Sequence, residues 1–123
     1  MMRASPPMES SKPSPVSQAA PTASLPLVGH RGLSHFYPEN TEAAIDGAIA
    51  AGLEGVEVDL RASRDGVPFL LHDPRLSRVA GTKARIDELD AIDVSQTNVT
   101  LSPPDPAPLA APATIPSFEA VYT

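Results

Sequence analysis

The sequence predicts an α/β fold, and three stretches carry that prediction. The apolar run in "LPLVGHRG" ends in a glycine, which is typical of a buried strand that feeds a loop. The stretch "TEAAIDGAIAAG" has the apolar spacing of a helix, and "GVEVDL" alternates as a strand does. A strand, a helix and a second strand in this order form a βαβ unit, whose usual setting is a parallel sheet.

The first strand is expected at Leu25 to Val28 and the helix at residues 41–52. The proline in "HFYPENT" disfavours helix just before it, and Asn40 or Thr41 can cap the helix N-terminus. Gly52 can end the helix in the left-handed conformation. The apolar face of this helix consists of Ala44, Ile45, Ala48, Ile49 and Gly52.

The second strand is expected at Gly55 to Leu60, and its alternation puts Glu57 and Asp59 on one face. The third strand is expected at Val67 to Leu71 and runs into His72.

The pair Asp65-Gly66 between these strands is a hairpin signal. A two-residue turn there places Asp59 directly opposite His72. A parallel pairing would bring the same two residues together at the C-terminal ends of the strands. We favour the hairpin.

The remainder of the chain is less regular. Residues 76–94 are expected to form a loop and a short helix around Ile86 to Ile92, and a proline-rich loop follows. The closing "SFEAVYT" is typical of a helix start capped by Ser117.

Composition bounds the organisation and the partners. Of 15 prolines, six lie in residues 1–26 and six in residues 103–116, so residues 1–25 are expected to be a disordered tail rich in Pro, Ser and Ala. The net charge is −6 without a block of Lys and Arg, which argues against nucleic-acid binding. No stretch has the length of a signal peptide's apolar run or of a transmembrane segment, so we expect a soluble, cytoplasmic protein.

Seven polar residues stand at or near the expected strand ends. They are His30, Arg31, Glu39, Glu57, Asp59, His72 and Asp73. Burying charge is costly, and a divalent cation such as Ca²⁺ or Mg²⁺ offsets that cost for two neighbouring carboxylates. Glu57 and Asp59 are therefore candidate metal ligands.

The flanking residues suit phosphoester cleavage. His30 and His72 could give and take protons near neutral pH, and the planar guanidinium of Arg31 matches a phosphate. A metal ion and an arginine would offset charge on the phosphoryl oxygens.

Each of these residues also has a structural interpretation. Glu57 and Asp59 could be the solvated face of an edge strand, and His30 could be a strand-end residue satisfied by backbone. Glu39 could have a purely structural role, as an ion-pair partner of Arg31 or as an acidic residue that favours the helix start. The His72-Asp73 pair before a proline could be turn chemistry.

Taken together, "GHRG", "PENT", the alanine-rich helix and "GVEVDLRASRDGVPFLLHD" resemble the glycerophosphodiester phosphodiesterase family. The order and spacing fit as well, since Glu57, Asp59 and His72 follow His30 by 27, 29 and 42 residues. Further downstream, "DPRLSRVAGTKARIDELDAIDV" and "IPSFEAVYT" look like the family's continuation, so the resemblance covers about residues 26–123.

The resemblance implies a TIM-barrel enzyme that hydrolyses glycerophosphodiesters to glycerol phosphate and an alcohol with the help of a divalent cation. By motif, His30 and His72 would be the catalytic acid and base, and Arg31 would hold the phosphate. Glu57 and Asp59 would bind the metal, and Glu39 would line the site. A glycerol hydroxyl of the substrate would act as internal nucleophile through a cyclic phosphate.

Length is where the chain departs from this family. A TIM barrel needs about 250 residues, so residues 26–123 are expected to form only the N-terminal part of the domain, with roughly three barrel strands. The partner implied is the missing C-terminal half of the barrel, including a third acidic metal ligand and later pocket residues. The alternative is a non-catalytic remnant or binding module of the same fold. We expect weak metal binding and little turnover from the chain alone.

Overall fold

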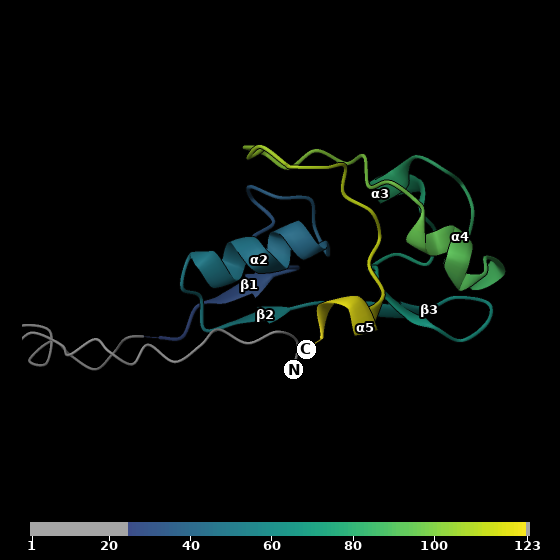
Figure 1. Ribbon diagram of the computed structural model, residues 1–123, viewed down its shortest axis with the longest axis horizontal. Coiled ribbons are helices and arrows are strands. Elements are labelled where there is room, and N and C mark those ends of the chain that lie inside the picture. The colour runs from purple at the N-terminus through teal and green to yellow at the C-terminus, as the bar shows by residue number, and fades with distance from the viewer. Residues whose placement is uncertain (1–24, 123) are drawn as a thin grey trace, which may run out of the picture.

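The computed structural model describes residues 25–122, so the expected N-terminal tail lies outside the described residues except for Leu25. Figure 1 shows helix α2 lying along strands β1 and β2 at one end of the molecule. Strand β3 and the short helices α3 and α4 occupy the other end, and the proline-rich segment of residues 97–116 runs between the two ends.

Strands β1 (Val28–His30) and β2 (Gly55–Glu57) pair in parallel, as the βαβ pattern predicts. Their register places His30 beside Glu57. The expected position of the first strand was wrong, because the strand begins where the apolar run ends. Leu27 and Val28 are exposed rather than buried, because α2 covers one face of a sheet that has two strands within residues 25–122.

Helix α2 (Glu42–Ala50) follows the sequence prediction closely. The Thr41 hydroxyl accepts a hydrogen bond from the Ala44 N–H at 3.2 Å, which caps the helix. Ala44, Ile45 and Ala48 are completely buried. The helix therefore packs with the face that its apolar spacing indicates.

The expected second strand is split. After β2 ends at Glu57, pairing resumes in β3 (Leu60–Ala62), which is antiparallel to β4 (Pro68–Leu70). The interruption has a local cause, since the Asp59 N–H donates to the Asn40 side chain at 3.3 Å.

The hairpin at Asp65-Gly66 is confirmed, but its register differs from the expected one by a residue. Leu60 pairs with Leu70, and the Leu71 N–H donates to the Asp59 carbonyl at 3.0 Å, so Asp59 lies opposite Leu71 and not His72. The Ser63 N–H donates to the Val67 carbonyl at 2.9 Å, which leaves a three-residue loop that ends in Gly66 at φ +83°. Left-handed glycine at the end of such a loop is a common hairpin geometry.

Only β1 and β2 pair in parallel within residues 25–122, so the expectation of roughly three barrel strands was wrong for the third. That strand, β4, separates two hydrophobic clusters instead. Phe69 and Leu71 belong to a cluster with Val79 on one side, while Leu70 packs with Ile45 on the other. Burial on both faces explains why the sequence there is continuously apolar.

Short elements complete the second half. They are α3 (Ser77–Ala80), the 3₁₀-helix η1 (Ile86–Glu88), α4 (Ala91–Ser95) and α5 (Phe118–Val121). The single helix expected around Ile86 to Ile92 was wrong, because extended residues at 89 and 90 divide it into η1 and α4. The predicted cap of the last helix is confirmed, since the Ser117 hydroxyl accepts from the Ala120 N–H at 3.1 Å.

The proline-rich segment has no helix or regular strand, as expected, and backbone hydrogen bonds attach it at several points. The N–H groups of Asp105 and Ala107 donate to the carbonyls of His35 and Phe36 at 3.1 Å and 2.9 Å. The Thr100 N–H donates to the carbonyl of Val79 in α3 at 2.7 Å. The segment therefore joins the β1–α2 loop to the second half of the chain.

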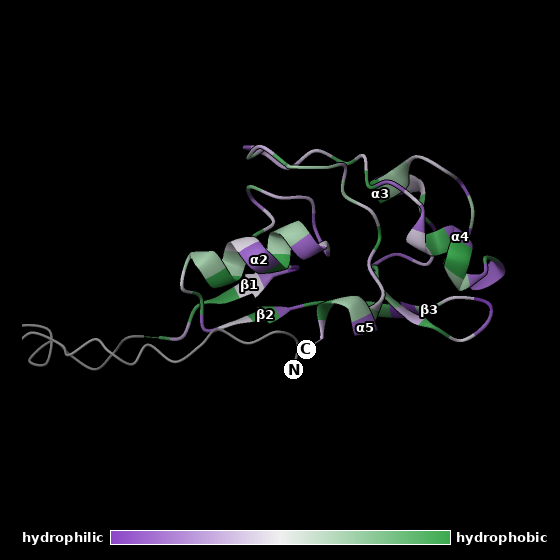
Figure 2. Cartoon of the chain, in the orientation of Figure 1, coloured by the Kyte–Doolittle hydropathy of each residue, from purple (hydrophilic) through white to green (hydrophobic). Residues whose placement is uncertain are grey.

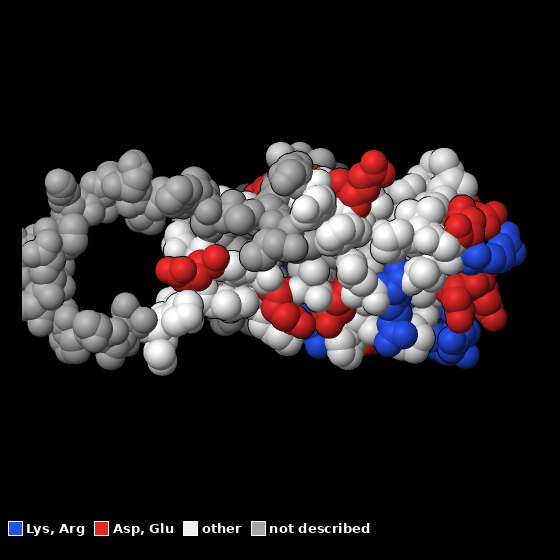
Figure 3. Space-filling view, turned by 90° about the horizontal axis from the view of Figure 1, so that it is seen from below, with Lys and Arg blue, Asp and Glu red and all other residues white. Residues whose placement is uncertain are grey.

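The surface mixes charge of both signs. Figure 3 shows basic side chains beside acidic ones at the hairpin end of the face in view. Figure 2 shows hydrophobic residues along the stretch that enters β1 and in β2. No helix within the described part of the chain has the length and apolar character needed to cross a membrane.

Candidate functional site

The loop after β1 is held tightly between α2 and β2. The Arg31 N–H donates to the Glu57 carbonyl at 2.7 Å, and the Leu33 N–H donates to the Ala44 carbonyl at 2.8 Å. Arg31 has φ +60°, which is uncommon for a residue other than glycine. Strained backbone of this kind is concentrated at functional sites, where the surroundings hold it in place.

Arg31 reaches two carboxylates. Its Nη1 donates to Glu39 Oε2 at 3.1 Å, and its Nε lies 3.4 Å from Asp59 Oδ2. The Arg31 side chain is 19% exposed. Its Nε is buried and makes no hydrogen bond within residues 25–122, so the Asp59 contact is an ion pair without hydrogen-bond geometry.

Asn40 fixes Asp59 from the other side. Asn40 is buried at φ +56°, and its Nδ2 donates to Asp59 Oδ2 at 3.2 Å while its Oδ1 accepts from the Asp59 N–H at 3.3 Å. Asparagine tolerates the left-handed region better than most residues. The "PENT" loop therefore supplies two residues that position others of the site: Glu39 contacts Arg31, and Asn40 contacts Asp59.

His30 and Glu57 form a more open pair. His30 Nε2 lies 3.8 Å from Glu57 Oε1, and the two side chains are 71% and 46% exposed. Both residues end their parallel strands and are partners in the register. Asp59 is partly buried, with 23% of its side chain exposed, so the expected burial of the acid pair applies to Asp59 and was wrong for Glu57.

A second cluster surrounds His72. His72 Nδ1 contacts Asp73 Oδ1 at 2.7 Å. Arg78 donates from Nε to Asp73 Oδ2 at 2.9 Å and from Nη2 to Glu39 Oε2 at 2.8 Å. Glu39 thus accepts hydrogen bonds from both Arg31 and Arg78 and connects the two halves of the candidate site.

The arginines also set the charge of this cluster. The hydrogen bonds from Arg78 are the main reason that the pKa of Glu39 lies below its ordinary value, and Arg31 lowers it further. Arg78, and to a lesser extent His72, lower the pKa of Asp73 to about 2. Asp73 is therefore ionised at neutral pH and can only accept hydrogen bonds.

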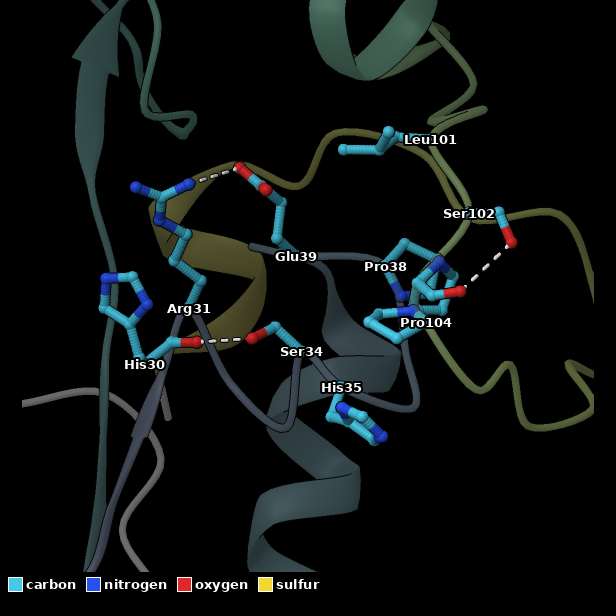
Figure 4. A pocket seen from close by; sticks show the side chains of 10 residues that line it. His30, Arg31, Ser34, His35, Pro38, Glu39, Leu101, Ser102 and Pro104 are labelled. Carbon is cyan, nitrogen blue, oxygen red and sulfur yellow. Dashed lines mark hydrogen bonds and ion pairs between the residues drawn. The ribbon is translucent and has the colours of Figure 1, made fainter.

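A cleft of about 340 Å³ opens beside Arg31 and Glu39. Figure 4 shows the two side chains turned toward each other at its rim, with the His30 ring next to Arg31 and Pro38, Pro104 and Leu101 across from them. The lining residues come from the β1–α2 loop and from residues 101–104. The proline-rich segment therefore forms one wall of the cleft.

The sequence-predicted residues fall into three groups. His30 lies with Glu57, and Arg31 lies with Glu39 and Asp59. The expected direct placement of His72 against Asp59 was wrong, because the three-residue loop shifts the register. His72 stands apart from both of these pairings. It is connected to the Arg31 group through Asp73, Arg78 and Glu39. Residues 25–122 contain no set of three or more His, Cys, Asp or Glu side chains arranged to hold a metal ion.

Three positioning residues were missed or undervalued. Asn40 was expected only as a helix cap, and Asp73 only as a neighbour of His72. Arg78 had no signal in the sequence, because its two partners precede it by 5 and 39 residues. Nothing in the local pattern separates it from Arg75, which instead donates to the Lys83 carbonyl at 3.1 Å.

Strands β1 and β2 end in charged side chains, and the cleft opens beside the end of β1. In α/β barrels the catalytic residues gather at the C-terminal ends of the parallel strands, so this arrangement is typical of the active-site edge of an α/β enzyme. Comparison with known proteins agrees. The model of the glycerophosphoryl diester phosphodiesterase family matches residues 30–122. Glycerophosphodiester phosphodiesterase 1 of Mus musculus is 40% identical over 78 residues, which are 63% of this chain and 24% of that protein.

Solved structures give the same result. A glycerophosphodiester phosphodiesterase from Agrobacterium tumefaciens superposes with a TM-score of 0.66 at 29% identity, over 77% of this chain and 40% of that one. A phosphodiesterase from Oleispira antarctica, solved with the product sn-glycerol-3-phosphate, gives 0.65 at 27% identity, over 78% of this chain and 38% of that one.

The chain belongs to the glycerophosphoryl diester phosphodiesterase family. It spans about a quarter of the length of the curated relatives that it matches and about two fifths of the solved chains. This coverage fits part of a TIM barrel.

Proposed function

We propose that this chain supplies the N-terminal part of a domain that hydrolyses glycerophosphodiesters to glycerol phosphate and an alcohol. The observation that carries the proposal is the register of β1 and β2, which brings His30 and Glu57 together at the strand ends, with Arg31 and Asp59 beside them. The neighbour from Oleispira antarctica was solved with sn-glycerol-3-phosphate, which supports a glycerol phosphate as product here.

In this proposal Arg31 binds the phosphate. Its guanidinium borders the cleft, and Glu39 and Asp59 orient it from two directions. Arginine presents paired donors in one plane, which match two phosphate oxygens. The phosphate would then share the positive charge of Arg31 with the two carboxylates that it now faces.

His30 and His72 would move the protons. The contact of His72 with ionised Asp73 makes its Nδ1–H the donor, which leaves Nε2 able to take a proton. The exposed ring of His30 lies beside Arg31 at the end of β1. One histidine would accept the proton of the attacking hydroxyl, and the other would protonate the leaving alcohol.

Glu57 and Asp59 would supply two ligands to a divalent cation such as Ca²⁺ or Mg²⁺. Carboxylate oxygens are the ligands that these ions prefer, but two acids are too few to hold one firmly. Further ligands would come from outside residues 25–122. When bound, the ion would supply positive charge next to the phosphoryl oxygens.

The test is a chimera in which this chain replaces the matching segment of the Agrobacterium tumefaciens enzyme. We expect cation-dependent release of glycerol phosphate from glycerophosphocholine. His30→Ala and His72→Ala should each lower the turnover number by about 10²–10⁴-fold with unchanged circular dichroism. A folded chimera that shows no cation-dependent hydrolysis contradicts the proposal.

The alternative is a module that binds a phosphate ester without turning it over. The open, half-exposed His30–Glu57 pair favours it for the chain alone. Isothermal titration of residues 1–123 with glycerol 3-phosphate separates the two functions. Binding that depends on Arg31, together with an inactive chimera, would support the alternative.

A further inference from the structure

Arg78 donates hydrogen bonds to two carboxylates that lie far apart in the sequence, those of Glu39 and Asp73. It donates from Nε and Nη2 to the two oxygens of Asp73 at 2.9 Å and 3.2 Å. It also donates from Nη1 and Nη2 to the two oxygens of Glu39 at 2.9 Å and 2.8 Å. Arginine can hold two carboxylates in this way because its donors are arranged as a rigid fork.

Each carboxylate in turn holds a residue of the proposed site. Asp73 contacts His72 Nδ1 at 2.7 Å, and Glu39 accepts from Arg31 Nη1 at 3.1 Å. Both contacts use an oxygen that Arg78 also binds. A movement of Arg78 would therefore reach the His72 ring and the Arg31 guanidinium together.

The backbone around Arg78 is well fixed. Val79 is buried in the larger hydrophobic cluster, and its carbonyl accepts from the N–H groups of Thr100 and Leu101 at 2.7 Å and 3.1 Å. Gly81 ends helix α3 in the left-handed conformation. Arg78 thus projects from a rigid turn that also supports the wall of the cleft.

We propose that Arg78 is a positioning residue that fixes the tautomer of His72 through Asp73 and the orientation of Arg31 through Glu39. The proposal rests on the proposed function for its catalytic meaning. With Asp73 ionised and held by Arg78, its oxygen accepts from His72 Nδ1–H, and Nε2 keeps its lone pair. Without Arg78, the contact with His72 would be the one side-chain interaction that the structure gives the Asp73 carboxylate within residues 25–122.

The test is a measurement that does not need turnover. The ¹⁵N shifts of the His72 ring in residues 1–123, recorded at alkaline pH where imidazole is neutral, report which nitrogen carries the proton. We expect the Nδ1–H tautomer in the wild-type chain. Arg78→Met should shift the ratio toward that of histidine in an unfolded control peptide, and the matched control Arg75→Met should keep the wild-type ratio.

A lysine variant covers the case in which Arg78→Met does not fold. Arg78→Lys keeps the charge but has no fork, so an intermediate tautomer ratio is expected. A wild-type ratio in Arg78→Met, or in Arg78→Lys, overturns the proposal. In an active chimera, Arg78→Met should lower kcat by about 10–100-fold, the size expected when a reacting group is misplaced, and Arg75→Met should not. If the chimera is inactive but Arg78→Met still changes the tautomer ratio of His72, the proposed function is contradicted and the positioning role of Arg78 is supported.

Discussion

Replacing Gly32 by alanine tests whether the loop that presents Arg31 is locked against helix α2. Gly32 has φ +83°, and a Cβ there would lie 2.6 Å from the Ala44 Cβ and 2.8 Å from the Ala44 carbonyl oxygen. The loop cannot move away from the Ala44 carbonyl without breaking a hydrogen bond, because the same carbonyl accepts from the Leu33 N–H. The substitution therefore meets both a conformational and a steric penalty.

The left-handed conformation costs a residue with a side chain about 1–2 kcal/mol. Forcing a methyl group into a packed contact costs about 1–3 kcal/mol more. We expect Gly32→Ala to lower the free energy of unfolding by about 2–5 kcal/mol in total. For a marginally stable chain such a loss is large, since whole domains are stable by about 5–15 kcal/mol.

Gly66→Ala is the matched control. Gly66 also has φ +83°, but a Cβ there meets nothing within 4 Å, so its expected loss is the conformational part alone, about 1–2 kcal/mol. Urea unfolding of residues 1–123, followed by circular dichroism, gives both values. Equal losses in the two variants would refute the close approach of the Arg31 loop to α2.

Three further predictions concern the charged network. Acidification should lower the free energy of unfolding. Folding lowers the pKa of Asp73 from its ordinary value of 3.8 to about 2, and it lowers that of Glu39 below its ordinary value of 4.5. The two carboxylates therefore stabilise the fold fully at a pH above their ordinary pKa values, and this stabilisation is lost as the pH falls through their pKa values in the folded chain. The contribution of Asp73 to the free energy of unfolding is about 1 kcal/mol once screening by solvent is allowed for. Urea unfolding at pH 6 and at pH 2 measures the pH-dependent loss. Equal free energies of unfolding at the two pH values would argue against the network. Asn40→Asp keeps an acceptor for the Asp59 N–H but removes the amide donor to the Asp59 carboxylate. The free energy of unfolding, measured by chemical denaturation, should fall by about 1–3 kcal/mol. Wild-type stability would contradict the role of that donor. Glu57→Gln should raise the cation concentration needed for half-maximal activity of the chimera, while an unchanged titration would remove Glu57 from the ligand set.

The sequence predicted best what short-range physics decides. The caps at Thr41 and Ser117 and the turn at Asp65-Gly66 depend on a few neighbouring residues, and all three are present. The parallel pairing of β1 with β2 followed from the order of the elements. The family resemblance added the expected barrel and the roles proposed for the site residues, which no single motif specified.

What failed depends on contacts that the local pattern does not contain. The hairpin register was set by the pairing of Ser63 with Val67 and not by the turn residues alone. The burial of the first strand depends on what covers the sheet, and the Arg78 network joins residues from separate loops. The alternation that predicted one strand from Gly55 to Leu60 could not reveal that Asn40 would take the Asp59 N–H.

The most direct test of the account measures glycerophosphocholine hydrolysis by the chimera with His30, Arg31 and His72 altered one at a time. The account predicts cation-dependent release of glycerol phosphate that His30→Ala and His72→Ala nearly abolish, and an Arg31→Ala variant whose KM for the substrate rises. Hydrolysis that persists at the original rate in all three folded variants would contradict it.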